Sequence, residues 1–491
     1  MSQISVEHLS FAYDGGEMLF RDVSFSIDTC WRLGLTGRNG RGKTTLLRIL
    51  AGQLPCAGAV RDKVPCVLFP FPVTDPTLPA AELLRSFAPD APDWRCACEA
   101  ERLGLDGAVL ARAFESLSKG EQVKCMLAAL FVQQGKYCLI DEPTDHLDAA
   151  GRRCVSAYLR HKQGFLLVSH DRDFLDGCTD HTLALGRDEV TLCRGNYSVW
   201  EREKLRRDAS EQARDAQLRR EIARLDQAAR RAEDWAGKAE QEKHTRNSGL
   251  RPDRGYLGSK AARLMKRAKT VQARRQQAAD EKRTLLRQVE TAEALRFQPL
   301  RWDKPSFLVQ AQEVCLYYGD RLVCRTSFCL RAGQRLAVTG PNGCGKSTLL
   351  NAVCGAAVKR TGTLVTAPGL VISRVPQDPG ECTGTPAELA ARAEVDRTLF
   401  FTLMRKFGFE REAFAQDASR FSTGQKKKAL LALSLSKPAH LYVWDEPLNY
   451  VDVLSRKQIE ALLQNAEIAL LLVEHDRAFL RNVGADELAL L

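Results

Sequence analysis

Short apolar segments alternate with helical stretches in two regions, one near each end of the chain. Residues 31–36 (WRLGLT) and 335–340 (RLAVTG) are largely apolar and run into glycine-rich turns, which is typical of buried strands. Thr44–Leu50 and Ser347–Val353 follow as predicted helices. This alternation predicts an α/β fold in each region, with a parallel sheet flanked by helices.

The middle of the chain has a helical period instead. Apolar residues there are spaced by alternating steps of four and three at Leu218, Ile222, Leu225, Ala229 and Ala232. The same rhythm continues from Leu264 to Ala292, and it predicts two helices packed as an antiparallel coiled-coil hairpin. Residues 247–258 between them concentrate Gly and Pro and cannot continue a regular helix. A helix of about 40 residues would span roughly 60 Å.

Charge separates the same regions. The 491 residues include 72 Lys and Arg against 61 Asp and Glu, a net charge of +11, and residues 201–300 alone carry +10. Residues 243–275 contain eleven basic residues and one acid. A charged helix of mixed sign is normally a solvated face, whereas a near absence of acids favours a polyanionic partner. The expected domains are residues 1–202, a basic helical-hairpin linker at 203–300 with its tip near 243–258, and residues 301–491.

Composition excludes several classes of protein. A hydrophobic share of 44% and a charged share of 27% are those of a globular protein. The longest unbroken apolar run, Cys125–Val132, has 8 residues, whereas a membrane-spanning helix needs about 20. The first residues lack a secretory signal pattern, and the sixteen cysteines occur without a CxxC spacing. These features predict reduced thiols and a cytoplasmic location.

The two flanking regions are copies of one unit. Five segments return in the same order: 9–27 as 314–330, 37–47 as 340–350, 116–124 as 420–428, 138–148 as 442–452, and 166–175 as 471–480. The intervals between them agree closely, and the offset between the copies is far longer than the period of a solenoid. The pattern therefore indicates duplication of a whole domain.

One repeated segment predicts nucleotide binding. Residues 37–44 and 340–347 match GxxxxGK[ST], in which glycine backbone N–H groups surround phosphate oxygens at a helix N-terminus. The lysine would reach the β- and γ-phosphates and the hydroxyl would ligate Mg²⁺. One match could be a glycine-rich turn with a surface lysine, but two matches between a strand and a helix favour nucleotide sites. The expected ATP-binding residues are Gly37, Asn39, Gly40, Gly42, Lys43, Thr44 and Thr45, with Gly340, Asn342, Gly343, Gly345, Lys346, Ser347 and Thr348.

A second repeated segment ends an apolar strand in two carboxylates. These are Asp141 with Glu142 in the first copy and Asp445 with Glu446 in the second. The aspartates would hold Mg²⁺ through water, and the glutamates would orient and polarise the attacking water. The sequence thus predicts hydrolysis of ATP to ADP and phosphate.

Histidines and tyrosines also recur. His170 and His475 lie 28 and 29 residues beyond those glutamates and would sense the γ-phosphate. A lone histidine is usually structural, but recurrence at matching positions favours the catalytic interpretation. Tyr13 and Tyr318 lie 24 and 22 residues before the first glycine of each phosphate loop. Either would stack on adenine, although a single tyrosine in such a place is more typical of a core.

The order of motifs resembles that of ABC ATPases. Residues 118–122 (SKGEQ) and 422–425 (STGQ) resemble the signature motif of that family, and the phosphate loop, signature, Asp-Glu-Pro and histidine occur twice in the same order. The resemblance implies two domains paired head to tail within one chain, with ATP and Mg²⁺ between one copy's phosphate loop and the other copy's signature. The signature residues that it adds to the ATP sites are Ser118, Gly120, Glu121, Ser422, Gly424 and Gln425.

The chain departs from the family pattern in places. The family's glutamine between phosphate loop and signature corresponds to Gln377, a further expected Mg²⁺ ligand, whereas the first copy has VLFPFPVTDP without a glutamine. The two sites therefore need not be equivalent. Glu474 stands where the first copy has Ser169, and Cys344 lies inside the second phosphate loop. The sequence explains neither.

With no predicted membrane span and a basic linker between two ABC domains, the chain resembles the ABC-F translation factors. Residues 252–290 and the motifs SLSKGEQ and DEPLNYVD are similar to the antibiotic-resistance branch typified by the Lsa proteins. The intervals Lys43–Gly120 and Lys346–Gly424, 77 and 78 residues, leave no room for the extra arm that housekeeping members often carry. The resemblance implies ATP-dependent protection of the ribosome from lincosamides, streptogramin A and pleuromutilins, by insertion of the linker through the tRNA exit region towards the peptidyl-transferase centre.

The linker would make the ribosome contacts. The expected contact residues are Lys243, Arg246, Arg251, Arg254, Tyr256, Leu257, Lys260, Arg263, Lys266, Arg267 and Lys269. Their cations would contact rRNA phosphates, and a tyrosine would stack on an unpaired base, so a bacterial ribosome with its peptidyl-site tRNA is the expected partner. A solubilising spacer is the alternative for this segment. Two other functions stay open, a general translation or ribosome-assembly factor and the ATPase subunit of an ABC transporter with separate membrane subunits.

Overall fold

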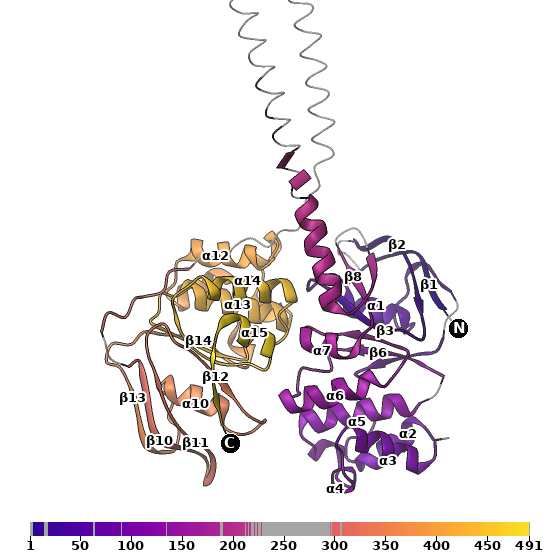
Figure 1. The fold of residues 1–491 in the computed structure, drawn as a ribbon, viewed down its shortest axis with the longest axis horizontal. Coiled ribbons are helices and arrows are strands. Elements are labelled where there is room, and N and C mark those ends of the chain that lie inside the picture. The colour runs from indigo at the N-terminus through magenta and orange to yellow at the C-terminus, as the bar shows by residue number, and fades with distance from the viewer. Residues whose placement is uncertain are drawn as a thin grey trace, which may run out of the picture. The chain divides into compact units, whose positions relative to one another are not determined.

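The computed structural model describes most of both repeat copies. The described residues are 3–13, 18–61, 64–89, 91–133, 135–186, 190–211, 213–214, 216–217, 220, 223, 227, 295, 297–304 and 307–490. The chain forms two compact units, residues 1–200 with 292–491 and residues 201–291. The larger unit contains both copies (Figure 1). In the smaller unit residues 201–211 are helical, and the predicted hairpin tip lies outside the described residues.

The first copy contains two sheets. Its antiparallel sheet has the spatial order β2 (Met18–Asp28), β1 (Gln3–Ala12) and β4 (Ala57–Arg61). The larger sheet has the order β5 (Cys66–Phe69), β6 (Tyr137–Asp141), β7 (Phe165–Val168), β3 (Arg32–Gly37), β8 (His181–Leu185) and β9 (Val190–Arg194). Its strands are parallel except for the antiparallel edge strand β9.

The helices of the first copy follow the order expected of an α/β domain. They are α1 (Lys43–Leu50), α2 (Ala80–Phe87), α3 (Asp93–Arg102), α4 (Gly107–Leu110), α5 (Lys119–Val132), α6 (Ala149–Arg160) and α7 (Arg172–Cys178), with a 3₁₀ turn at Phe114–Ser116.

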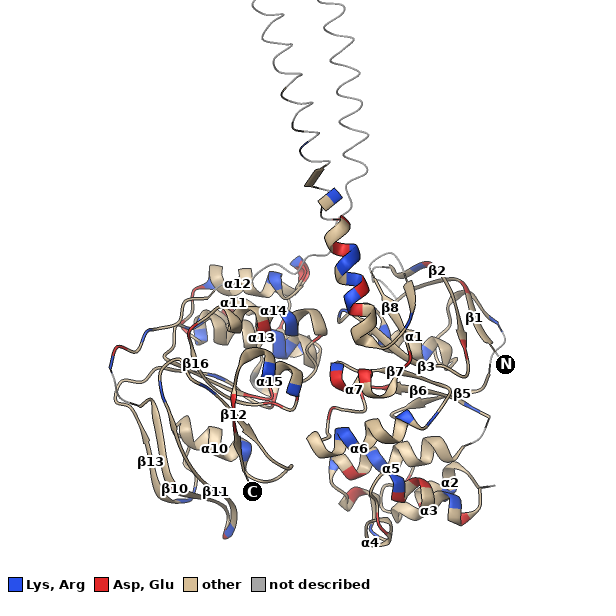
Figure 2. Cartoon of the chain, viewed as in Figure 1, with Lys and Arg blue, Asp and Glu red and all other residues tan. Residues whose placement is uncertain are grey.

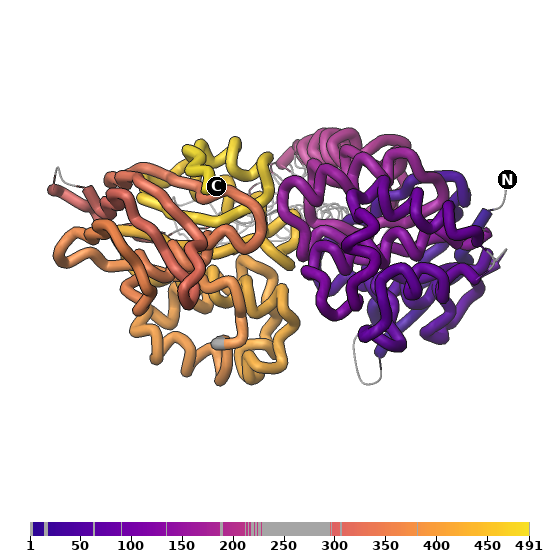
Figure 3. Tube along the Cα trace, turned by 90° about the horizontal axis from the view of Figure 1, so that it is seen from below, coloured from indigo at the N-terminus to yellow at the C-terminus, as the bar shows by residue number. Residues whose placement is uncertain are grey.

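The second copy repeats this architecture, and Figure 3 traces the two copies in different colours. Its antiparallel sheet has the order β11 (Arg321–Leu330), β10 (Val309–Tyr318) and β13 (Arg360–Thr366). Its parallel sheet has the order β14 (Ile372–Val375), β15 (Leu441–Asp445), β16 (Ala469–Val473), β12 (Arg335–Thr339) and β17 (Asp486–Ala489).

The second copy also alternates helices with its strands. They are α10 (Lys346–Val353), α11 (Pro386–Arg392), α12 (Arg397–Lys406), α13 (Thr423–Ser436), α14 (Val453–Gln464) and α15 (Arg477–Val483), with 3₁₀ turns at Pro379–Glu381, Arg411–Phe414 and Ala418–Arg420.

Each parallel sheet separates two hydrophobic cores. In β15, Tyr442 and Trp444 belong to the core beneath α13 and α14, whereas Leu441 and Val443 belong to the core on the opposite face. Alternate residues of a strand point to opposite faces, so a strand that is buried on both faces must be apolar throughout. This requirement explains the continuous apolar runs in the sequence.

The structure confirms the α/β prediction. The predicted strand at 31–36 is β3, and the predicted helix at Thr44–Leu50 is α1 with one additional residue. Basic and acidic residues are interspersed over the helices of both copies (Figure 2), in agreement with the near-neutral charge outside residues 201–300. Within the described residues, none of the helices combines the length and the apolar character that crossing a membrane would require.

Candidate nucleotide sites

Each phosphate loop leads from a buried strand into a helix without a side-chain cap. The caps of α1 and α10 are Gly42 and Gly345, with positive φ of 84° and 89°. The helices α5, α6 and α7 are instead capped by a Ser or Asp side chain. A Cβ on Gly42 would lie 2.6 Å from Leu19 Cδ2, so a larger residue does not fit. The uncapped N–H groups at the start of these helices are suited to bind phosphate.

The lysines of the two loops are buried against their own loops. Lys43 Nζ donates to Gly37 O at 2.9 Å, and Lys346 Nζ donates to Gly340 O and Pro341 O, both at 2.9 Å. Burial lowers the pKa of Lys43 against the attraction of neighbouring carboxylates. These carbonyl groups direct each ammonium group towards the loop, where a phosphate would supply the missing negative charge.

The residues that would hold magnesium contain unpaired buried oxygens. Thr44 Oγ1 donates to Asp141 Oδ2 at 2.7 Å, and Ser347 Oγ donates to Gln377 Oε1 at 3.4 Å. Among the described residues, Asp141 Oδ1 and Asp445 Oδ1 are buried without a hydrogen-bond partner. Burial raises the pKa of both aspartates, which a bound cation would counteract. Hydroxyl, amide and carboxylate oxygens are ligands that Mg²⁺ accepts, so this donor set fits the ion.

Strand register identifies the residue that replaces Gln377 in the first copy. Phe69 and Val375 end β5 and β14, and each pairs with the residue before the aspartate of the adjacent strand. Gln377 follows Val375 by two residues, so Phe71 takes its position in the first copy. The Phe71 ring packs on Phe87 with a centroid distance of 4.0 Å. The first copy therefore has an aromatic residue at the register position where the second has an amide.

The two glutamates have the same unusual backbone. The φ angles of Glu142 and Glu446 are 47° and 46°, in the left-handed region that non-glycine residues rarely adopt. Their N–H groups donate to Val168 O and Val473 O, both at 3.0 Å. Strain of this kind persists where the surrounding structure imposes it, often at functional sites.

The glutamate side chains lie beside the two histidines. Glu142 Oε1 is 3.2 Å from His170 Nε2, and its Oε2 accepts from the backbone N of His170 at 3.2 Å. Glu446 Oε1 is 3.6 Å from His475 Nε2, and its Oε2 accepts from Asn449 Nδ2 at 2.7 Å. The structure therefore brings each predicted glutamate and histidine together.

The two glutamates differ in electrostatics. Burial, and secondarily the charge of Asp145, raises the pKa of Glu142 to about 8. Burial raises the pKa of Asp145 to about 7. At Glu446 burial also favours the neutral form, but hydrogen bonds from His475 and Gln377 outweigh it, and the pKa is lowered.

The signature segments start α5 and α13 through capping boxes. Ser118 Oγ accepts from Glu121 N at 3.3 Å and Glu121 Oε2 accepts from Ser118 N at 2.8 Å. Ser422 and Gln425 repeat this pair at 3.3 and 2.9 Å. The side chains of Glu121 and Gln425 are thus engaged in capping the helix.

Each phosphate loop contacts the other copy. Asn39 Nδ2 donates to Tyr450 O at 2.8 Å, and Asn342 Nδ2 donates to His146 O at 3.4 Å. A Cβ on Gly424 would lie 2.9 Å from Asn39 Nδ2, so the second signature lies beside the first phosphate loop. These contacts join the two copies in the arrangement that a shared ATP site requires.

The predicted adenine-stacking tyrosines are accessible. Tyr13 is 49% exposed, and its hydroxyl lies 3.0 Å from Thr45 Oγ1. Tyr318 is 81% exposed at the end of β10. A pocket of about 240 Å³ separates the start of β11 from the second phosphate loop, and it is lined by Arg321, Leu322, Val323, Pro341, Asn342, Gly343 and Cys344. The sequence had not singled out the β11 residues, and it had placed Cys344 in the phosphate loop without giving it a role.

The predicted ribosome contacts lie outside the described residues. These are Lys243, Arg246, Arg251, Arg254, Tyr256, Leu257, Lys260, Arg263, Lys266, Arg267 and Lys269. They remain predictions from sequence.

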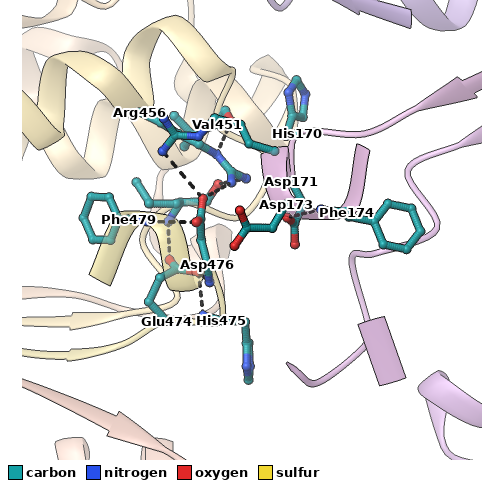
Figure 4. Close-up of polar contacts among 12 residues, drawn as sticks. His170, Asp171, Asp173, Phe174, Val451, Arg456, Glu474, His475, Asp476 and Phe479 are labelled. Carbon is teal, nitrogen blue, oxygen red and sulfur yellow. Dashed lines mark hydrogen bonds and ion pairs between the residues drawn. The ribbon is translucent and has the colours of Figure 1, made fainter. Parts of the chain in front are cut away.

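The sequence did not single out a buried arginine that recurs beside each histidine. Arg456 Nε donates to Val451 O at 2.9 Å, and Nη1 donates to Asp476 Oδ2 at 3.2 Å (Figure 4). Arg152 makes the same pair of contacts, with Asp171 Oδ2 at 3.0 Å. Both arginines occupy matching positions in the repeat, so comparison of the two copies was the available signal.

Comparisons with known proteins agree with this geometry. The family model described as ABC transporter matches residues 20–145 and 323–449, which together make up about half of the chain. The ribosome protection protein VmlR of Bacillus subtilis is 27% identical, over 96% of this chain and 84% of VmlR. The ATP-binding protein Uup of Caulobacter vibrioides is 29% identical, over 97% of this chain and 75% of Uup.

Solved structures share the fold. An archaeal ribosome recycling factor, aABCE1, crystallised with the ribosomal stalk protein aP1, superposes with a TM-score of 0.62 at 18% identity, covering 98% of this chain and 87% of that one. The RNase-L inhibitor gives a TM-score of 0.61 at 19% identity, with the same coverage.

The chain belongs to the ABC transporter family and is an ATPase with two such domains. Its relatives within that family are ABC-F proteins, among them VmlR. The predicted resemblance to the ABC-F family is therefore confirmed.

Proposed function

We propose that this ATPase binds the bacterial ribosome and protects it from antibiotics that act at the peptidyl-transferase centre. The observation that carries the proposal is the basic segment between the two ATPase domains, because residues 201–300 hold +10 of the +11 net charge. Polyanion binding uses such a concentration of cations, whereas an ATPase subunit of a transporter would need only a short neutral linker. The similarity to the ribosome protection protein VmlR extends over 96% of the chain and supports the same assignment.

The proposed domains are residues 1–202, the linker 203–300 and residues 301–491. Glu142 and Glu446 would each orient a water molecule towards the γ-phosphate, with His170 and His475 beside them. Mg²⁺ held near Asp141 and Asp445 would neutralise charge on the phosphates. Hydrolysis would then reopen the paired domains and release the ribosome.

The linker would carry the effect to the ribosome. Its cations would contact rRNA phosphates and its tip, 243–258, would enter the tRNA exit region near the peptidyl-site tRNA. Displacement of lincosamides, streptogramin A or pleuromutilins from the centre is the proposed outcome. A general translation factor with the same fold would bind the ribosome without this effect.

Ribosome co-sedimentation tests the first step. The variant Glu142→Gln with Glu446→Gln should hold ATP without hydrolysing it and should sediment with ribosomes at about 50 mM salt, and more weakly at about 200 mM. A protein that stays in the supernatant at both salt concentrations would contradict ribosome binding. Protection of in-vitro translation against a panel of the three drug classes then separates a resistance protein from a general factor.

A charge-matched pair of variants tests the linker. One variant carries Gln in place of Arg263, Lys266, Arg267 and Lys269. The slope of the logarithm of the binding constant against the logarithm of the salt concentration should become shallower by about 3, because each lost phosphate contact removes roughly 0.7–0.9 from it. The control replaces four exposed arginines of the second copy, Arg325, Arg331, Arg360 and Arg411. Equal effects of the two sets would argue against the linker as the binding surface.

A further inference from the structure

The two catalytic glutamates start from matching backbone positions. Glu142 and Glu446 share positive φ angles of 47° and 46°, and the same backbone hydrogen bond to the adjacent strand at 3.0 Å. Any difference in how their carboxylates are held must therefore come from neighbouring side chains and loops.

In the second copy a side-chain amide holds the glutamate. Asn449 Nδ2 donates to Glu446 Oε2 at 2.7 Å, which is a short bond to a charged acceptor. The first copy has Asp145 at the equivalent position, three residues after Glu142. Within the described part of the chain, the Glu142 carboxylate takes its hydrogen bond from His170 N and none from Asp145, so the bond from Asn449 has no counterpart in the first copy.

In the first copy a backbone group holds the glutamate. His170 N donates to Glu142 Oε2 at 3.2 Å. The preceding residue, Ser169, is too short to compete for this donor, and its hydroxyl lies 3.1 Å from Thr144 Oγ1 and accepts from Asp171 N at 3.1 Å.

Glu474 occupies that backbone donor in the second copy. Its Oε1 accepts from His475 N at 2.8 Å and from Asp476 N at 3.4 Å, and its Oε2 accepts from Leu448 N at 3.3 Å. Figure 4 draws Glu474 with its chain neighbours His475 and Asp476. The His475 N–H therefore points to Glu474, and Asn449 supplies the donor to Glu446 Oε2 instead.

We propose that Asn449 and Glu474 are positioning residues that act as a pair, so that the two ATP sites hold their catalytic glutamates by different donors. The proposal depends on the catalytic role of Glu142 and Glu446 given above. In the first copy the glutamate is anchored to the histidine loop and moves with it. In the second copy the glutamate is anchored within its own loop, residues 446–449, and Glu474 joins the histidine loop to Leu448 independently.

The test isolates the second site and transplants the arrangement of the first site into it. In a Glu142→Gln background, single-turnover hydrolysis of labelled ATP under excess protein reports the second site. Asn449→Asp should lower the hydrolysis rate there by about 10- to 100-fold, because a displaced base loses alignment with its water, while the Kd for ATP stays within twofold. Adding Glu474→Ser to Asn449→Asp should raise the hydrolysis rate at least tenfold again, because it frees the His475 N–H to donate to Glu446.

Two controls make each outcome decisive. Asn465→Asp changes an exposed asparagine at the end of α14 and should leave the rate unchanged. Asn449→Ala removes the donor without adding charge, and should lose rate as Asn449→Asp does. A rate within twofold of the parent for both Asn449 variants, or no recovery in the double variant, overturns the positioning pair. Full activity of Glu446→Gln in the wild-type background would instead overturn the catalytic assignment.

Discussion

Arg456→Met should destabilise the second ATPase domain strongly. The Arg456 side chain is 6% exposed and that of its partner Asp476 is 0% exposed. Besides its ion pair at 3.2 Å, Arg456 donates to Val451 O and Leu448 O, both at 2.9 Å. Removing one partner of a buried pair costs about 3–5 kcal/mol, because the remaining charge is left uncompensated.

The first copy supplies the matched comparison. Arg172 Nη2 lies 4.0 Å from Asp476, so part of its charge remains compensated after Arg456→Met. Within the described part of the chain, Arg152 is the one cation in ion-pair contact with Asp171, at 3.0 Å. We therefore expect the free energy of unfolding to fall by about 3 kcal/mol in Arg456→Met and by about 4–5 kcal/mol in Arg152→Met.

Urea unfolding followed by tryptophan fluorescence measures the loss in the second copy, since Trp444 is fully buried in its core. A loss of about 3 kcal/mol lowers the midpoint by about 1 M for a slope near 3 kcal/mol/M. Adding Asp476→Asn to Arg456→Met should recover about half of the lost stability, because the uncompensated charge of the Asp476 carboxylate is removed. A midpoint shift below about 0.3 M, or no recovery in the double variant, would refute the reasoning.

Three further expectations concern other parts of the molecule. Tyr158→Phe should destabilise the first copy by about 1.5–3 kcal/mol in urea unfolding, because its hydroxyl donates to the buried carboxylate of Glu99 at 2.5 Å; an unchanged midpoint would contradict this. Burial raises the pKa of Cys125 to about 12 from a value near 9 when unfolded, so its thiol should resist alkylation at pH 8 while exposed Cys329 reacts. The thiol of the unfolded chain loses its proton at a lower pH than the buried thiol, so the free energy of unfolding should fall as the pH rises above about 9. Mass spectrometry measures the alkylation, and unfolding at several pH values measures the change in stability. Gln377→Ala should raise the Mg²⁺ concentration for half-maximal hydrolysis at the second site about tenfold, the loss expected for one hydrogen-bonded ligand; an unchanged Mg²⁺ dependence would count against its role.

Much of the fold was predictable because the determining features are local. The phosphate loop needs glycines, a lysine and a helix start within eight residues, and all of these are visible in the sequence at 37–44 and 340–347. The apolar runs of the buried strands are equally local, since a strand covered on both faces has no polar position. The linker has a visible period and charge, and its predicted hairpin remains a prediction.

The differences between the two sites were not predictable in the same way. The missing glutamine of the first copy was visible, but its replacement by Phe71 depends on the register of β5 against β6. The sequence could not explain why Glu474 stands in the second copy where the first has Ser169. In the structure Glu474 accepts a hydrogen bond from the backbone N of Leu448, 26 residues away in the chain.

The sequence by itself therefore determined the class of chemistry, two ATP sites built from repeated motifs and joined by a basic segment. The tertiary structure decided which donor holds each glutamate. The reason is that a hydrogen bond depends on the distance and direction between two groups, and the conformation of the folded loops fixes both. Residue identity determines which hydrogens the side chains of Asn449 and Asp145 have to donate. The fold then brings the Asn449 amide within 2.7 Å of the Glu446 carboxylate.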